Sequence, residues 1–134
     1  MTVIAGAVTQ STGSVRCLVH ASGGMGKAAG SAGRQDQHKS EVTVPGILLE
    51  EFVYRHGNPP PQVVKMDIDS GEVMTLPGMH RILADARPSM LMELHRIESS
   101  RIAWEALTVA GYDVCWMRPG FPVVPSLTWS PLQG

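Results

Sequence analysis

The sequence contains no uninterrupted apolar run that approaches the roughly 20 residues of a membrane-crossing helix. Charged residues are scarce as well, at 17% of the chain, and they leave a net charge of −1. Because so balanced a charge attracts neither nucleic acid nor an anionic membrane, we expect neither as a partner. The N-terminal segment MTVIAGAVTQ has no basic region and no cleavage pattern, so we expect no signal peptide and a cytoplasmic location.

Cysteine is scarce and histidine is not clustered. The two cysteines, Cys17 and Cys115, stand far apart and belong to no Cys-x-x-Cys pair, so we expect free thiols rather than a disulfide. The five histidines form no His-x-His, His-Glu-x-x-His or Cys/His group. The spacing therefore predicts no metal site.

The first 40 residues divide into two parts. Residues 1–20 are apolar and β-branched around a turn, which predicts a strand over Thr2–Val8 and a second over Ser14–His20. Residues 21–40 are small, polar and rich in glycine, which is typical of a flexible loop. A Gly-Lys pair within it is no phosphate-binding loop, because Ala21 and Ala28 stand where that motif needs glycine and a hydroxyl residue.

Residues 41–134 alternate between strand and helix patterns. We expect strands over Glu41–Val44, Val63–Ile68, Met90–Leu94 and Tyr112–Met117, and helices over Leu48–Tyr54, Gly71–Ala84 and from Ser99 or Ser100 to Ala110. Pro77 predicts a kink or two short helices within Gly71–Ala84. At 134 residues with 43% hydrophobic content, the chain fits one domain of α/β class with mostly parallel strands and flanking helices.

Acidic residues follow two of these strands. Asp67 and Glu93 interrupt apolar strand ends, and His95 comes directly after Glu93. Because ligands of α/β sheets bind at the carboxyl ends of the strands, these three side chains are our candidate catalytic residues, with Asp67 first. A purely structural role for Asp67 and Glu93 is equally open. For Asp69 we expect helix capping, and for Lys65 an ion pair with a carboxylate such as Glu72.

The segment Lys65–Glu72 resembles the Lys-Ile-Asp-Val-Glu-Gly-Ala-Glu signature of the FkbM family of S-adenosylmethionine-dependent methyltransferases. Flanking segments are similar to that family too: Ile47–Val53, Leu76–Met79, Arg87–His95 and Ala110–Tyr112. Asp69 and Ser70 replace the usual Glu-Gly. The resemblance covers nearly the whole chain and implies part of a Rossmann-like class I methyltransferase sheet.

What the resemblance implies is methyl transfer from S-adenosylmethionine to a small-molecule acceptor, a hydroxyl of a saccharide or secondary metabolite. The family's Asp-x-Gly-Ala-x-x-Gly cofactor motif is absent from these 134 residues, so the cofactor-binding residues are unknown and the chain corresponds to a truncated C-terminal half. We expect the strand at Val3–Val8 to lack its partner and the strand at Val63–Ile68 to have an open apolar edge. Such an edge favours self-association. The alternative is a non-catalytic fragment or interaction module that needs a separate N-terminal half.

Overall fold

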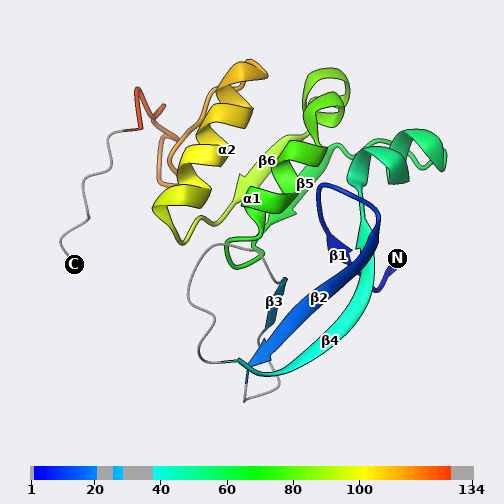
Figure 1. Ribbon diagram of the computed structural model, residues 1–134. Coiled ribbons are helices and arrows are strands. Elements are labelled where there is room, and N and C mark those ends of the chain that lie inside the picture. Colours follow the sequence, from blue (N-terminus) through cyan, green and yellow to red (C-terminus); the bar gives the residue numbers. More distant parts are fainter. Residues whose placement is uncertain (1, 21–25, 29–37, 128–134) are drawn as a thin grey trace.

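The protein contains two small sheets, with helices packed on the second (Figure 1), in a computed structural model that describes residues 2–20, 26–28 and 38–127. The first sheet has the order β1-β4-β2-β3. Its strands are β1 (Ala7–Val8), β2 (Gly13–His20), β3 (Gly26–Ala28) and β4 (His38–Ile47). The long ladder between β2 and β4 is antiparallel, as is β2 with β3, whereas the short pairing of β1 with β4 is parallel.

The second sheet consists of β5 (Val63–Met66) and β6 (Ser89–Met92), which pair in parallel from Val63↔Ser89 to Met66↔Met92. Parallel neighbours need a crossover connection, and here it is helical. It comprises α1 (Glu72–Thr75), η2 (Leu76–Gly78) and η3 (Ile82–Ala86). Pro77 lies in the first turn of η2, so the predicted interruption into short helices is confirmed.

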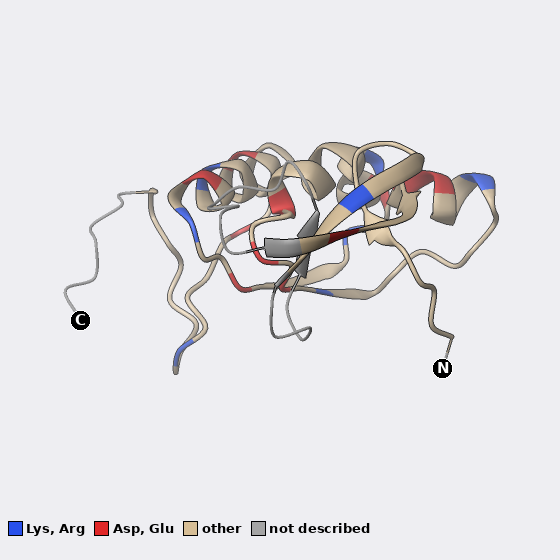
Figure 2. Ribbon diagram, turned by 60° about the horizontal axis from the view of Figure 1, so that its bottom comes forward, with Lys and Arg blue, Asp and Glu red and all other residues tan. Residues whose placement is uncertain are grey.

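The core lies between one face of β5–β6 and the helices. Strand alternation directs Met66 inward beside the half-buried Val64, while Val63 and Lys65 are exposed. Helix α2 (Ile97–Val109) packs against α1 and η2. The buried apolar side chains of this core are Val53, Met66, Leu76, Met79, Ile82, Leu83, Ala103 and Leu107. Figure 2 shows the helices lying as a layer on one side of these strands.

A close approach at Gly78 joins the two parts of the molecule. A Cβ at Gly78 would lie 2.6 Å from the Leu48 Cδ1 atom and 3.3 Å from the Thr9 carbonyl oxygen. Nearby, the Thr75 hydroxyl donates to the Val8 carbonyl oxygen over 3.2 Å. A side chain at this position would displace Leu48 and press on the backbone at Thr9 and Gln10, so Gly78 favours the close packing of this segment against the helices that support β5 and β6.

The last helix is held at its C-terminal end by Arg87. The Arg87 guanidinium donates to the carbonyl oxygens of Ala110 (2.8 Å) and Gly111 (3.0 Å) and lies over the Tyr112 ring. Burial raises the pKa of the Tyr112 phenol, with the positive charge of Arg87 opposing the shift. Gly111, at φ +76, ends the helix as expected.

Several expectations about secondary structure are wrong in extent or kind. Tyr112–Met117 adds no third strand to β5–β6, since its only ladder contact among the described residues is a bridge from Cys115 to Val123. The N-terminal strand is reduced to Ala7–Val8, and it pairs with β4 rather than lacking a partner. The expected arrangement of mostly parallel strands therefore holds for the second sheet but not for the first.

The glycine-rich segment and the helix caps also differ from expectation. Within residues 21–40, Gly26–Ala28 and His38–Ser40 form strands, because they extend the β2–β4 hairpin; residues 21–25 and 29–37 lie outside the described residues. The last helix begins at Ile97, so Ser99 and Ser100 lie within it instead of capping it. The predicted strand Ser14–His20 is confirmed within β2. The helix expected over Leu48–Tyr54 is confirmed one residue later in the chain, at residues 49–55, where η1 (Glu51–Arg55) forms most of it.

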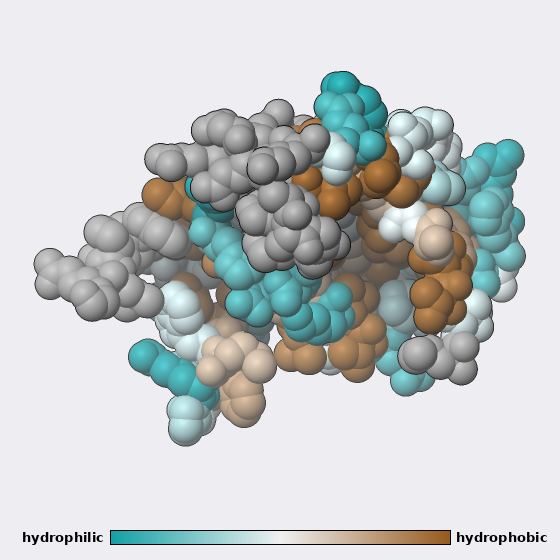
Figure 3. Space-filling view, turned by 90° about the horizontal axis from the view of Figure 1, so that it is seen from below, coloured by the Kyte–Doolittle hydropathy of each residue, from teal (hydrophilic) through white to brown (hydrophobic). Residues whose placement is uncertain are grey.

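The surface is mixed in charge and in polarity. Lys and Arg alternate with Asp and Glu along the ribbon in Figure 2, and seen from below apolar patches lie between hydrophilic ones (Figure 3). Both cysteines are free, Cys17 half-buried and Cys115 exposed. Within the described ranges, every helix is too short or too polar to cross a membrane.

Candidate functional site

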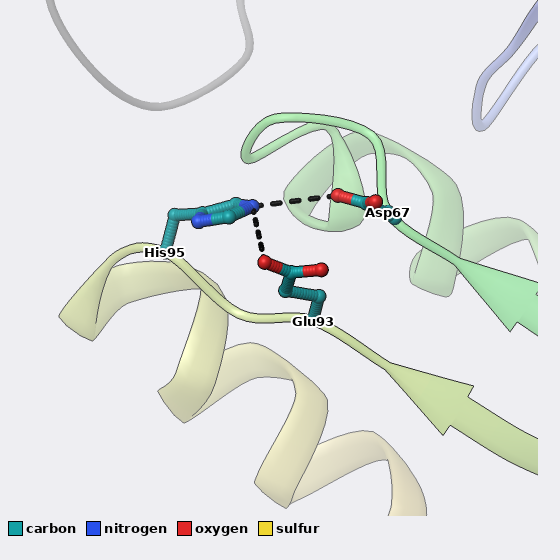
Figure 4. A group of neighbouring side chains, drawn as sticks. All are labelled: Asp67, Glu93 and His95. Atoms are coloured by element: carbon teal, nitrogen blue, oxygen red, sulfur yellow. Dashed lines mark hydrogen bonds and ion pairs between the residues drawn. The ribbon is translucent and has the colours of Figure 1, made fainter.

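Asp67, Glu93 and His95 meet at the carboxyl ends of β5 and β6 (Figure 4). Asp67 directly follows β5, and Glu93 directly follows β6. The Glu93 amide donates to the Met66 carbonyl oxygen over 3.0 Å, which extends the parallel register one residue beyond the strands. His95 is two residues farther along, and its ring turns back toward both carboxylates. The three candidate residues are thus brought together as expected.

The imidazole of His95 lies between the two carboxylates. Its Nε2 atom is 3.4 Å from Asp67 Oδ1 and 3.9 Å from Glu93 Oε1. One potential ligand atom from each of the three residues lies within 4.8 Å of the others. The side chains are 42% (His95), 39% (Asp67) and 62% (Glu93) exposed, so the group is open to a ligand from solvent.

Lys65 and His95 lower the pKa of the Asp67 carboxyl. The larger cause is the hydrogen bond from Lys65, whose Nζ atom is 2.7 Å from Asp67 Oδ2, and the second is the hydrogen bond with His95. Lys65 therefore pairs with Asp67 and not with Glu72, which is fully buried. Because the folded pKa lies below the unfolded one, this contribution to stability is present above the unfolded pKa and is lost as pH falls through the folded value.

A strained turn follows Asp67. The Gly71 amide donates to the Ile68 carbonyl oxygen over 2.9 Å, and the two residues between them, Asp69 and Ser70, have φ values of +49° and +70°. Non-glycine residues rarely adopt this region. Helix α1 begins at Glu72, and no side chain caps its N-terminus. The capping role expected for Asp69 is therefore wrong, because the turn places Gly71, and not Asp69, at the N-cap position.

We predict that Ser70→Gly stabilises the protein by about 1 kcal/mol. Glycine adopts positive φ without strain, and the change also removes a buried hydroxyl that has no hydrogen-bond partner. Urea unfolding measures the difference. The matched control is Ser89→Gly in β6, where φ is not positive and glycine should destabilise the strand. A loss of stability in Ser70→Gly would contradict the interpretation that the backbone at Ser70 is strained.

Sequence reasoning missed what lies beneath the turn. Ser70, Glu72 and Ser99 are buried, and their side-chain oxygens have no hydrogen-bond partner in the described part of the chain. Glu72 belongs to the acidic segment that drew attention in the sequence, but the pattern alone does not say that its side chain points inward. The available signal for an inward-pointing Glu72 was its helical spacing from Leu76 and Met79, because residues three to four apart share one helix face.

The arrangement can perform two kinds of chemistry. An imidazole beside carboxylates can take a proton from a bound hydroxyl while the carboxylates fix the ring. Two carboxylate oxygens and an imidazole nitrogen can also coordinate a divalent cation. The rule based on Cys and His spacing did not detect this second possibility, because the three ligands come from two strand ends joined by a helical crossover.

Comparisons with protein-family models, with curated proteins and with solved structures each found no match to this chain.

Proposed function

We propose that this chain is the acceptor-side half of an S-adenosylmethionine-dependent methyltransferase of the FkbM type, which methylates a hydroxyl of a saccharide or secondary metabolite. The observation that carries the proposal is the convergence of Asp67, Glu93 and His95 at the carboxyl ends of two adjacent parallel strands. This is the position at which α/β sheets bind ligands. The segment Lys65–Glu72 that resembles the family signature leads directly into it.

The backbone at Ser70 also supports the proposal. The family signature has glycine where this chain has Ser70, and the φ of +70° at that position is one that glycine adopts freely. If this chain and the family form the same turn, the signature glycine should coincide with a left-handed backbone, and it does so at Ser70. Serine in place of glycine then adds strain at this position.

Within this function, His95 is the better proton acceptor. A general base should have a pKa near the operating pH, and the pKa of Asp67 is shifted downward, away from that range. Asp67 and Glu93 would then orient the ring and stabilise it once it is protonated. This reverses the order expected from the sequence, in which Asp67 came first. Holding hydroxyl and methyl donor in line would supply much of the remaining acceleration.

Because no Asp-x-Gly-Ala-x-x-Gly motif occurs in this sequence, the proposal requires a second polypeptide portion that holds the cofactor. A direct experiment supplies that part as the N-terminal portion of an FkbM methyltransferase, co-expressed with the chain, and follows labelled methyl transfer from S-adenosylmethionine to a panel of saccharides and hydroxylated metabolites. The proposal predicts transfer by the pair and none by either part alone. A pair that binds the cofactor but methylates nothing in the panel would contradict it.

A second candidate function is a non-catalytic interaction module. It is favoured by the second sheet, since β5 and β6 pair only with each other among the described strands. Their outward side chains include the exposed Val63 (59%) and Leu91 (41%), although parallel sheets are usually covered on both faces. Sedimentation analysis separates the candidates: a stable self-associated form that a Val63→Lys change disperses, together with no methyl transfer by the co-expressed pair, favours the module.

A further inference from the structure

We infer that Asp67, Glu93 and His95 form a binding site for a divalent transition-metal cation. The inference goes beyond the proposed function, because binding is measured on this chain alone, without cofactor or acceptor.

The distances suit one cation bound by all three residues. Ligands at about 2.1–2.3 Å from an octahedral ion lie about 3 Å apart when adjacent and about 4.4 Å apart when opposite. Here the His95 nitrogen is 3.4 Å and 3.9 Å from oxygens of Asp67 and Glu93, and all three ligand atoms lie within 4.8 Å of one another. The exposed side chains therefore need to close by roughly an ångström, which side-chain rotation allows, to surround an ion.

The charge of the group is also compatible with a bound cation. Asp67 and Glu93 bring two carboxylates to one imidazole, and the ammonium of Lys65 contacts only Asp67, through Oδ2. The Oδ1 atom of Asp67, which faces His95, remains directed into the cluster. With a neutral imidazole, the two carboxylates exceed the single ammonium by one negative charge, so the group attracts a divalent ion placed between the three residues.

The ligand types select the kind of ion. Two carboxylate oxygens and one imidazole nitrogen suit Mn²⁺, Fe²⁺, Co²⁺ or Zn²⁺ better than Mg²⁺ or Ca²⁺, which prefer oxygen alone. Three protein ligands leave positions for water or a substrate oxygen. If the proposed methyl transfer holds, the ion would lower the pKa of the acceptor hydroxyl and His95 would act as ligand; activity that survives a chelator would instead assign His95 as the base.

The test is titration of the purified chain with Mn²⁺, followed by the loss of the free-ion electron paramagnetic resonance signal. We expect one bound ion per chain, and binding weakened on the order of tenfold or more by Asp67→Asn, Glu93→Gln or His95→Gln. Lys65→Met should tighten binding, because it removes an ammonium that competes for Asp67. Matched controls are Asp85→Asn and His80→Gln, which remove an exposed acid and an exposed histidine elsewhere.

The outcomes separate clearly. Circular dichroism confirms that each variant is folded before its titration counts. Binding that all three site variants weaken, and both controls leave unchanged, supports the site. Equal binding by wild type and the site variants, or no binding at millimolar Mn²⁺, would overturn it. Neither result depends on whether the co-expressed pair transfers methyl groups.

Discussion

Replacing Leu76 by Ala should lower the free energy of unfolding by about 2–5 kcal/mol, the range for large-to-small changes in a packed core. Leu76 is fully buried in η2, the short helix between Thr75 and Met79. It belongs to the same buried cluster as Met66 at the end of β5, the residue that precedes Asp67. The cavity would therefore weaken the core on which the strand end that presents the site is packed.

Urea unfolding followed by circular dichroism measures this effect. The matched control is Val109→Ala in α2, where the side chain is 88% exposed and the loss should stay below about 0.5 kcal/mol. Equal effects of the two changes would mean that the helices and β5–β6 do not enclose a common core. A large effect of Leu76→Ala alone would support the packing that positions the carboxyl ends of both strands.

The second large effect concerns His95. In the co-expressed pair proposed above, His95→Gln should reduce kcat by about 10²–10⁴-fold, the usual contribution of a positioned general base. Glutamine keeps the size and polarity of the side chain but cannot take the proton. The cofactor affinity of the pair should be unchanged, because in that design the co-expressed N-terminal portion supplies the cofactor motif. The acid limb of the pH–rate profile, where a base becomes protonated, should be lost as well.

The control for that measurement is His80→Gln, on an exposed helical residue far along the chain from the strand ends. It should leave kcat within about twofold of the unsubstituted pair, as expected for a surface change. If His95→Gln retains full activity, His95 is neither the base nor a ligand that the reaction needs. The proposal would then have to move to Glu93, the remaining acid of the group.

The site could be predicted from the sequence because short segments of the chain carry the patterns that identify it. An acidic residue after an apolar run marks a strand end, and two such runs joined by helical sequence predict parallel neighbours. That was enough to place Asp67, Glu93 and His95 together. The expected pairing of Lys65 with a carboxylate is found, but Glu72 was the wrong example, because the pattern could not show that Glu72 turns into the core while Asp67 stays at the surface.

The first 47 residues were harder to predict, because their structure depends on contacts distant in sequence. β4 runs through Pro45 and Gly46, both poor strand formers, because its ladder with β2 holds them there. The expected strand at Tyr112–Met117 has suitable residues, but it turns back toward Val123 instead of joining β6. Tertiary pairing decided both cases against local preference.

The central claim is that Asp67, Glu93 and His95 act as one site, and the titration of the Asp67 carboxyl tests it most directly. Carbon-detected nuclear magnetic resonance of the side-chain carboxyl across acidic pH gives its pKa. We predict a pKa below the ordinary value of an aspartic acid, which rises when Lys65 is changed to Met and also, by a smaller amount, when His95 is changed to Gln. An ordinary pKa that neither change moves would contradict the account, because Asp67 would then be a solitary surface acid.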